Sequence, residues 1–175
     1  MAGQRTDVGS TGLSRIGRHL LHHRWVVRRV FPDAVLARIE QAIVASEARH
    51  GGQVRFAVEG ALDGAPLFAG QSARARAIDV FARLRVWDTA HNNGILIYLL
   101  LADRDVEIVA DRGIAARVAQ AEWDDICHAM EAEFRSGQFE DGVLKGIDAV
   151  TRLLAAHFPP TGAGRNELPD RPVLL

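Results

Sequence analysis

The sequence contains a single cysteine, Cys127, among 175 residues. One thiol cannot form an internal disulfide, and nothing in the cysteine usage indicates an oxidising compartment. The longest apolar run, residues 95–102, is far shorter than the roughly 20 apolar residues that a membrane-spanning helix requires. The basic start of the chain also lacks the uninterrupted apolar stretch and the cleavage site of a secretory signal. These absences predict a soluble, cytoplasmic protein.

The signatures of common catalytic and nucleotide-binding sites are missing as well. The chain has no glycine-rich loop ending in lysine and serine or threonine, no paired-glycine loop after a strand, no His-Glu-x-x-His and no nucleophile elbow. Four of the seven histidines lie near arginines, at positions 19, 22, 23 and 50. Because neighbouring arginines oppose the binding of a cation, we do not predict a zinc site.

Charge is unevenly distributed along the chain. Residues 1–31 hold six arginines and one aspartate, a net charge of +5, so the remainder carries −6 given the total of −1. A specific nucleic-acid site is not predicted, because this remainder, the body of the chain, is acidic. Residues 1–12 have no apolar period and predict a disordered leader. Residues 13–31 combine arginines with apolar residues near helical spacing, which predicts a basic amphipathic helix.

Two interpretations of the basic helix are open. Residues 13–30 either bind a membrane surface or an acidic partner, or pack on the domain with their arginines in solvent. The second interpretation is favoured, because runs of charge are usually solvated faces. The first would make the protein peripheral to a membrane.

The pattern of residues 32–158 alternates between helical and strand periods. The strand at 95–102 is apolar throughout, as expected for a strand that is buried on both faces. The helix before it gives a connection long enough for a right-handed parallel crossover. The Pro/Gly-rich end, residues 159–175, is predicted to be flexible. Helices are predicted over 33–50, 72–87, 115–136 and 139–157, and strands over 53–59, 95–102 and 105–110.

Two side chains with reactive groups are interpreted as structural. Glu47 lies where the apolar stripe of the first of these helices reaches the helix end. A carboxylate there either belongs to a site or is bound by an arginine or by backbone donors, and we favour the second alternative. Cys127 lies within the apolar stripe of its helix, so we interpret it as a small core residue rather than a reactive thiol.

Polar side chains are concentrated at the two ends of the central strand. Asp88, Asn92 and Asn93 precede this strand, and Asp103 and Asp105 follow it. Carboxylate and amide oxygens are the ligands that hard divalent cations prefer. At about 3.3 Å per residue, the two ends lie more than about 20 Å apart and cannot share one ion. The sequence therefore offers two alternative cation sites, one at each end.

Several segments carry a family resemblance. They are Ser46-Glu47-Ala48-Arg49-His50 leading into Gln53-Val54-Arg55-Phe56, Arg83-Leu84-Arg85-Val86-Trp87-Asp88, Asn92-Asn93-Gly94-Ile95-Leu96-Ile97, Asp103-Arg104-Asp105-Val106-Glu107-Ile108, and a closing helix after Gly137-Gln138-Phe139. Together they resemble the TPM domain family over residues 32–158. The Asn-Asn-Gly strand with its Asp-Arg hairpin is the specific part. The layout is similar to short bacterial members that lack a signal peptide and a membrane anchor.

The resemblance implies a three-layer α/β/α sandwich with a small mixed sheet, in agreement with the predicted order of helices and strands. It also implies an optional calcium or magnesium site, since some members bind these ions through acidic loops. The absence of a nucleophile–base pair and the basic leader on an acidic body predict an accessory domain that binds a protein partner. By position, Asp88 and Asn93 before the central strand and Asp103 in the hairpin are the alternative metal ligands. They are not one joint site.

A weak metal-assisted acid phosphatase is the alternative function, because plant thylakoid members are linked to photosystem repair and to acid phosphatase activity. Asp88 or Asp103 would then serve as nucleophile or ligand. No catalytic residue is named by the sequence itself. Where relatives often have a Gly-x-Gly-Leu-Glu segment, this chain has Asp111-Arg112-Gly113-Ile114. The arginine beside Asp111 opposes cation binding there.

Overall fold

A single four-stranded sheet with the order β3-β2-β1-β4 forms the centre of the protein, as seen in a computed structural model that describes residues 19, 24–62, 66–67, 69–160 and 166–175. Strand β1 runs parallel to β2 and β4, and β3 runs antiparallel to β2. The strands are β1 Gln53–Glu59, β2 Gly94–Leu100, β3 Asp105–Ala110 and β4 Val173–Leu174.

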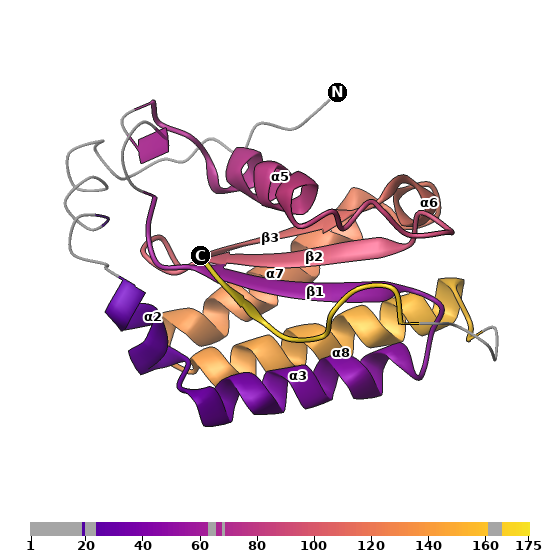
Figure 1. Ribbon diagram of the computed structural model, residues 1–175, viewed down its shortest axis with the longest axis horizontal. Helices are drawn as coiled ribbons and strands as arrows, with labels where there is room; N and C mark the ends of the chain where they lie inside the picture. The colour runs from indigo at the N-terminus through magenta and orange to yellow at the C-terminus, as the bar shows by residue number, and fades with distance from the viewer. Residues whose placement is uncertain (1–18, 20–23, 63–65, 68, 161–165) are drawn as a thin grey trace.

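Helices cover both faces of this mixed sheet. Figure 1 shows α2, α3, α7 and α8 on one face and α5 on the other, which confirms the predicted α/β/α sandwich. The short helix α6 follows β3 at the end of the sheet where β2 begins. The helices are α2 Arg24–Val30, α3 Asp33–Glu47, α5 Ala73–Arg83, α6 Arg112–Ala115, α7 Gln120–Arg135 and α8 Phe139–His157.

The side chains of β2 divide the interior into two cores, because successive residues of a strand point to opposite faces. Ile95, Ile97 and Leu99 pack with the core under α3, α7 and α8. Leu96 and Leu100 pack with the core under α5. The prediction of a strand buried on both faces is therefore confirmed. Cys127 is also buried in the first core, as predicted.

Glycine begins β2 for a steric reason. A Cβ at Gly94 would overlap the carbonyl oxygen of Val86, at the end of the turn that follows α5. The backbone of this turn thus lies directly against the first residue of the strand. Ser72 begins the same connection by accepting a hydrogen bond from the Ala75 amide (3.1 Å), which caps α5. These two features fix the parallel crossover from β1 to β2.

The end of the chain differs from the predicted flexible tail. Within 159–175, β4 pairs with β1 at Ala57 and Val58, and Leu168 is buried. The physical reason is that the outer edge of β1 has backbone groups that require partners, and nearby apolar side chains cover them. Residues 161–165 lie outside the described part.

The basic helix predicted over 13–31 is described only in part. Residues 24–30 form α2 and His19 is helical, whereas the rest of 13–23 and the whole leader 1–12 lie outside the described residues. Within the part of the chain that the structure describes, no helix is both long and apolar enough to cross a membrane.

Candidate functional site

The loop that precedes β2 is tied to the start of β1 through Asn93. Its amide donates to Thr89 Oγ1 (3.0 Å), and its carbonyl accepts from the Gln53 amide (2.9 Å). Its side-chain Nδ2 donates to the Gly51 carbonyl. Asn93 is 6% exposed, and its Oδ1 has no hydrogen-bond partner among the described residues. The loop thus holds one buried oxygen that is free to accept.

The segment after β3 lies against this loop. The Asp111 amide donates to the Gly94 carbonyl (2.9 Å), and the Gly113 amide donates to the Asn92 carbonyl (3.0 Å). Asp111 Oδ1 accepts from the Arg112 amide (2.7 Å) at the start of α6. Asp111 is 9% exposed, and its Oδ2 is buried with no partner in the described structure. Two unpartnered oxygens, on Asn93 and Asp111, therefore belong to adjoining segments.

Arg112 does not pair with its sequence neighbour Asp111. Its Nε donates to Asn92 Oδ1 (2.9 Å), and the residue is exposed. The guanidinium is thus turned toward Asn92, and no ion pair joins Arg112 to Asp111 in the described structure. Sequence reasoning gave little weight to Asp111 because of this neighbour. The available signal was the position of Asp111 directly after a strand.

Asp88 and Asp103, the other two predicted ligands, lie at opposite ends of β2 and each faces a cationic or ionisable partner. Asp88 is exposed, and its Oδ2 lies 2.6 Å from Arg85 Nη2. Asp103 Oδ2 lies 3.1 Å from Nε2 of the buried His19. Nδ1 of His19 accepts from the Leu62 amide (2.8 Å), so in the neutral ring the proton is on Nε2, which makes no hydrogen bond to a described residue despite its short distance to Asp103.

A cluster of three or more His, Cys, Asp or Glu side chains that could hold a metal is not found in the described residues. The three predicted ligands are therefore not brought together. What the structure brings together is the backbone of residues 92–94 and that of residues 111–113, through the bonds of Gly94 with Asp111 and of Asn92 with Gly113. The side chains of Asn93 and Asp111 follow the alternation of β2 and β3 to opposite faces of the sheet.

Beneath α5 lies a buried ionic network that the sequence analysis missed. Glu59 accepts two hydrogen bonds from Arg76 (2.8 Å each) and one from Tyr98 Oη (2.6 Å). Burial, and then the Glu59 carboxylate, raise the pKa of Tyr98 far above its usual value, so the phenol keeps its proton. Every charge in this network has a partner, and the network is best explained as structural.

A serine–histidine pair is present but is not arranged as a nucleophile and base. Ser46 Oγ lies 2.9 Å from His50 Nε2 and 2.6 Å from Thr151 Oγ1, and Thr151 donates to the Ile147 carbonyl (2.6 Å). His50 Nδ1 accepts from the Gly52 amide (3.1 Å), so the ring proton is on Nε2 and points to the serine. All three side chains are at most 3% exposed. Burial lowers the pKa of His50 to about 4.

Glu47 is bound by a backbone donor, as predicted. Its Oε1 accepts from the Val54 amide (2.7 Å). Burial raises the pKa of Glu47 to about 7, Asp170 adds to this rise, and the Val54 amide and the Arg55 charge oppose it. The carboxyl group therefore keeps its proton in mildly acidic solution and is about half ionised near pH 7.

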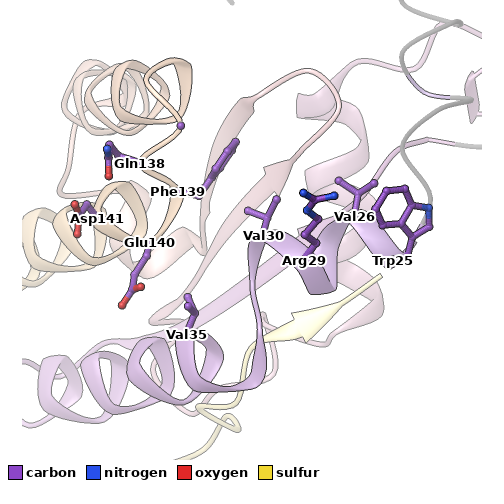
Figure 2. Close-up of a pocket in the computed structure, with 10 residues that line it drawn as sticks. Trp25, Val26, Arg29, Val30, Val35, Gln138, Phe139, Glu140 and Asp141 are labelled. Carbon is purple, nitrogen blue, oxygen red and sulfur yellow. The ribbon is translucent and has the colours of Figure 1, made fainter.

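A hollow of about 700 Å³ separates α2 from the turn between α7 and α8. Figure 2 shows Trp25, Val26, Arg29 and Val30 of α2 on one side, and side chains from the start of α8 on the other. Trp25 is 59% exposed at its border. The walls carry both signs of charge, with Arg29 on α2 and two acidic residues in the first turn of α8.

Comparison with known proteins agrees with this fold. A family model for the TPM domain matches residues 27–153, which confirms the resemblance drawn from the sequence. The NMR structure of BA42 protein from the psychrophilic bacterium Bizionia argentinensis is similar with a TM-score of 0.72 and 29% identity, over 81% of this chain and 93% of that chain. The solution NMR structure of an N-terminal domain from P. gingivalis has a TM-score of 0.60 and 19% identity, over 74% and 79% respectively, and shows the fold alone. The curated proteins contain no match.

Proposed function

This chain belongs to the TPM domain family, and on that basis we propose that it is an accessory, partner-binding domain that holds Ca²⁺ or Mg²⁺ where β2 begins. The observation that supports the cation is Oδ2 of Asp111, a buried carboxylate oxygen without a hydrogen-bond donor among the described residues. A buried carboxylate is costly unless a cation or donors compensate it.

The chemistry of this oxygen fits a hard cation. Asp111 would supply a carboxylate, a ligand that Ca²⁺ and Mg²⁺ accept, and the amide oxygen of Asn93, on the other face of the sheet, is an alternative ligand rather than a second one for the same ion. Water would complete the coordination, as it does for Mg²⁺ in most protein sites. Asp103, at the other end of the strand, is the less favoured ligand because it already faces His19.

The test is a titration of the protein with Ca²⁺ and with Mg²⁺ followed by backbone amide shifts. We expect saturable shifts confined to residues 92–94 and 111–113, and their loss in Asp111→Asn. The matched controls, Asp88→Asn and Asp103→Asn, remove a carboxylate elsewhere and should keep the shifts. Equal shifts in Asp111→Asn and wild type, or no localised shift at millimolar ion, would exclude this site.

A peripheral membrane contact is the second candidate function, and a specific feature of α2 favours it. Trp25 is 59% exposed, and Arg28 and Arg29 on the same helix are also exposed. An exposed aromatic ring with cationic neighbours is typical of helices that lie at an anionic bilayer surface. In co-sedimentation with anionic vesicles, Trp25→Ala should bind several-fold less, and Trp87→Ala, which removes another exposed ring (48%), should bind as wild type. Equal binding of Trp25→Ala and wild type would end this proposal.

The phosphatase alternative makes a separate prediction. Its carboxylates, Asp88 and Asp103, lie against Arg85 and His19. If either acts as nucleophile or ligand, the double variant Asp88→Asn, Asp103→Asn should hydrolyse an aryl phosphate more slowly than wild type at saturating Mg²⁺. Equal rates would assign any turnover to a contaminant and end this alternative.

A further inference from the structure

The hollow beside α2 is bordered by one face of that helix. The residues of α2 that line it are Trp25, Val26, Arg29 and Val30. Positions 25 and 29, and likewise 26 and 30, lie one helical turn apart and share a face of the helix. Val27 lies on the inner side, where it is buried in the core at 1% exposure. Helix α2 is thus anchored by its inner face, while a second face borders the hollow.

The apolar lining on the other side of the hollow is held firmly by the core. The ring of Phe139 stacks on Phe134 with centroids 5.3 Å apart, and it meets the ring of Phe31 edge-on at 6.3 Å. Val35, in the first turn of α3, also lines the hollow and is 7% exposed. Because these side chains are already packed, the apolar surface is formed before anything binds. A preformed surface keeps the entropic cost of binding low.

The charges on the two walls are compensated to different degrees. On the α8 wall, Glu140 is bound by both Nε and Nη2 of Arg38, and the charge of Asp141 acts on Lys145 one turn later. On the α2 wall, the side chain of Arg29 is exposed, and no ion pair joins it to any residue that the structure describes. The charge that is left to attract a ligand is therefore positive.

We propose that this hollow binds an acidic segment of a partner protein. An aromatic or aliphatic side chain of that segment enters between Val30 and Phe139, which lie on facing sides of the hollow, and a neighbouring carboxylate pairs with Arg29 (Figure 2). This inference rests on the partner-binding role proposed above and gives that role a surface.

The size and composition of the hollow support a peptide as its occupant. Its volume of about 700 Å³ accommodates a few side chains. Trp25, 59% exposed at the border, and Arg29 are of the residue types that contribute most to affinity at protein–protein interfaces. Arg28 adds a second exposed positive charge to the same helix, which favours approach of an acidic rather than a basic segment.

The first test selects a displayed library of random peptides on the full chain. Selected peptides should carry an aspartate or glutamate beside an aromatic or aliphatic residue. A labelled peptide of this kind should shift the amides of residues 25–30 and 137–141. Selection on Arg29→Glu should instead enrich lysine or arginine at the same place, because the charge of the wall is reversed. Arg28→Glu is the matched control: Arg28 is exposed on the same helix but does not line the hollow, so this variant should still select acidic peptides.

The second test measures binding of one selected acidic peptide to variants of the full chain. Arg29→Glu should weaken binding by about tenfold, because an attraction becomes a repulsion, whereas Arg28→Glu should weaken it less than about threefold. Val30→Phe fills the hollow without changing the charge of α2. It should also weaken the peptide by about tenfold, yet sediment with anionic vesicles as wild type does. If Val30→Phe does not fold, the two arginine variants, both at exposed positions, still decide.

Three results would overturn this surface. They are acidic peptides selected equally well on Arg29→Glu, amide shifts that lie outside residues 25–30 and 137–141, and shifts of these residues that grow with protein concentration without peptide, which would assign the hollow to a second copy of the chain. A peptide that binds elsewhere on the chain removes the hollow but leaves the partner-binding role. Failure to select any peptide counts against both.

Discussion

The partly buried Glu47 and the buried His50, near the end of α3, have pKa values shifted in opposite directions, and together they predict an unusual pH dependence of stability. Burial raises the pKa of Glu47 from 4.5 to about 7 and lowers that of His50 from 6.5 to about 4. Between pH 4.5 and 7, the folded chain holds a proton on Glu47 that the unfolded chain has released. The free energy of unfolding therefore falls as pH rises through this range.

His50 acts in the opposite sense. Between pH 6.5 and 4, the unfolded chain binds a proton on this ring that the folded chain refuses, so the free energy of unfolding falls as pH falls. Each group changes stability by about 1.4 kcal/mol per pH unit. The two slopes have opposite signs and cancel between pH 4.5 and 6.5. In wild type, the free energy of unfolding therefore shows little effect of either titration between pH 4.5 and 6.5.

The full shifts correspond to about 3 kcal/mol each. His50 is 3% exposed and keeps about this value, whereas Glu47 is only partly buried, so solvent screening reduces its contribution to about 2 kcal/mol. A variant that lacks one group should show the pH dependence of the other. From pH 4.5 to 6.5, the free energy of unfolding of Glu47→Gln should rise by about 2 kcal/mol relative to that of wild type. Over the same range, the free energy of unfolding of His50→Gln should fall by about 2 to 3 kcal/mol relative to that of wild type.

Chemical denaturation at pH 4.5, 5.5 and 6.5 measures these differences. Packing that is lost in a variant lowers its free energy of unfolding by the same amount at every pH. The quantity to compare is therefore how the difference in free energy of unfolding between variant and wild type changes with pH. Ser46→Ala is the matched control, because it removes a hydrogen bond of His50 without removing a titrating group. If the free energy of unfolding of Glu47→Gln and of His50→Gln changes with pH as that of wild type does, the reasoning is refuted.

Three further substitutions test the packing of the sheet and its ionic network. Gly94→Ala should lower the free energy of unfolding by more than about 3 kcal/mol, because the new methyl group meets the backbone of Val86, which cannot move aside. A loss below about 1 kcal/mol in chemical denaturation would contradict this contact. Gly137→Ala, at φ +80° and with open space around it, should cost only about 1 to 2 kcal/mol by the same assay. Tyr98→Phe should cost about 1 to 3 kcal/mol in thermal unfolding, because Glu59 loses a buried donor, and an unchanged midpoint would show that the bond contributes nothing.

The layers of the fold were predictable because burial of apolar side chains dominates the energetics. The alternation of Val54, Phe56 and Val58 along β1 and the apolar run of β2 both have the period of a strand, and each residue lies on the face that the pattern indicates. The parallel crossover followed from the length of the connection. These are local signals, and tertiary packing did not override them.

Strand β4 could not be predicted from local pattern. It has two residues, too few for a period, and it follows a Pro/Gly-rich stretch. What holds it is a set of groups on β1 that lie more than 100 positions earlier, such as Gln53 and Arg55. The same limit applies to the network of Glu59 with Arg76 and to the contact of His19 with Asp103, since their members meet only after the sheet has formed.

Asp111 shows how adjacency in sequence misleads an electrostatic argument. Arg112 follows it directly, yet the start of α6 turns the two side chains to different partners, and Arg112 donates to Asn92. The carboxylate that sequence reasoning treated as compensated is therefore the one left with an unpartnered oxygen. Asp88, one of the alternative ligands that the sequence predicts, has its own arginine three residues earlier.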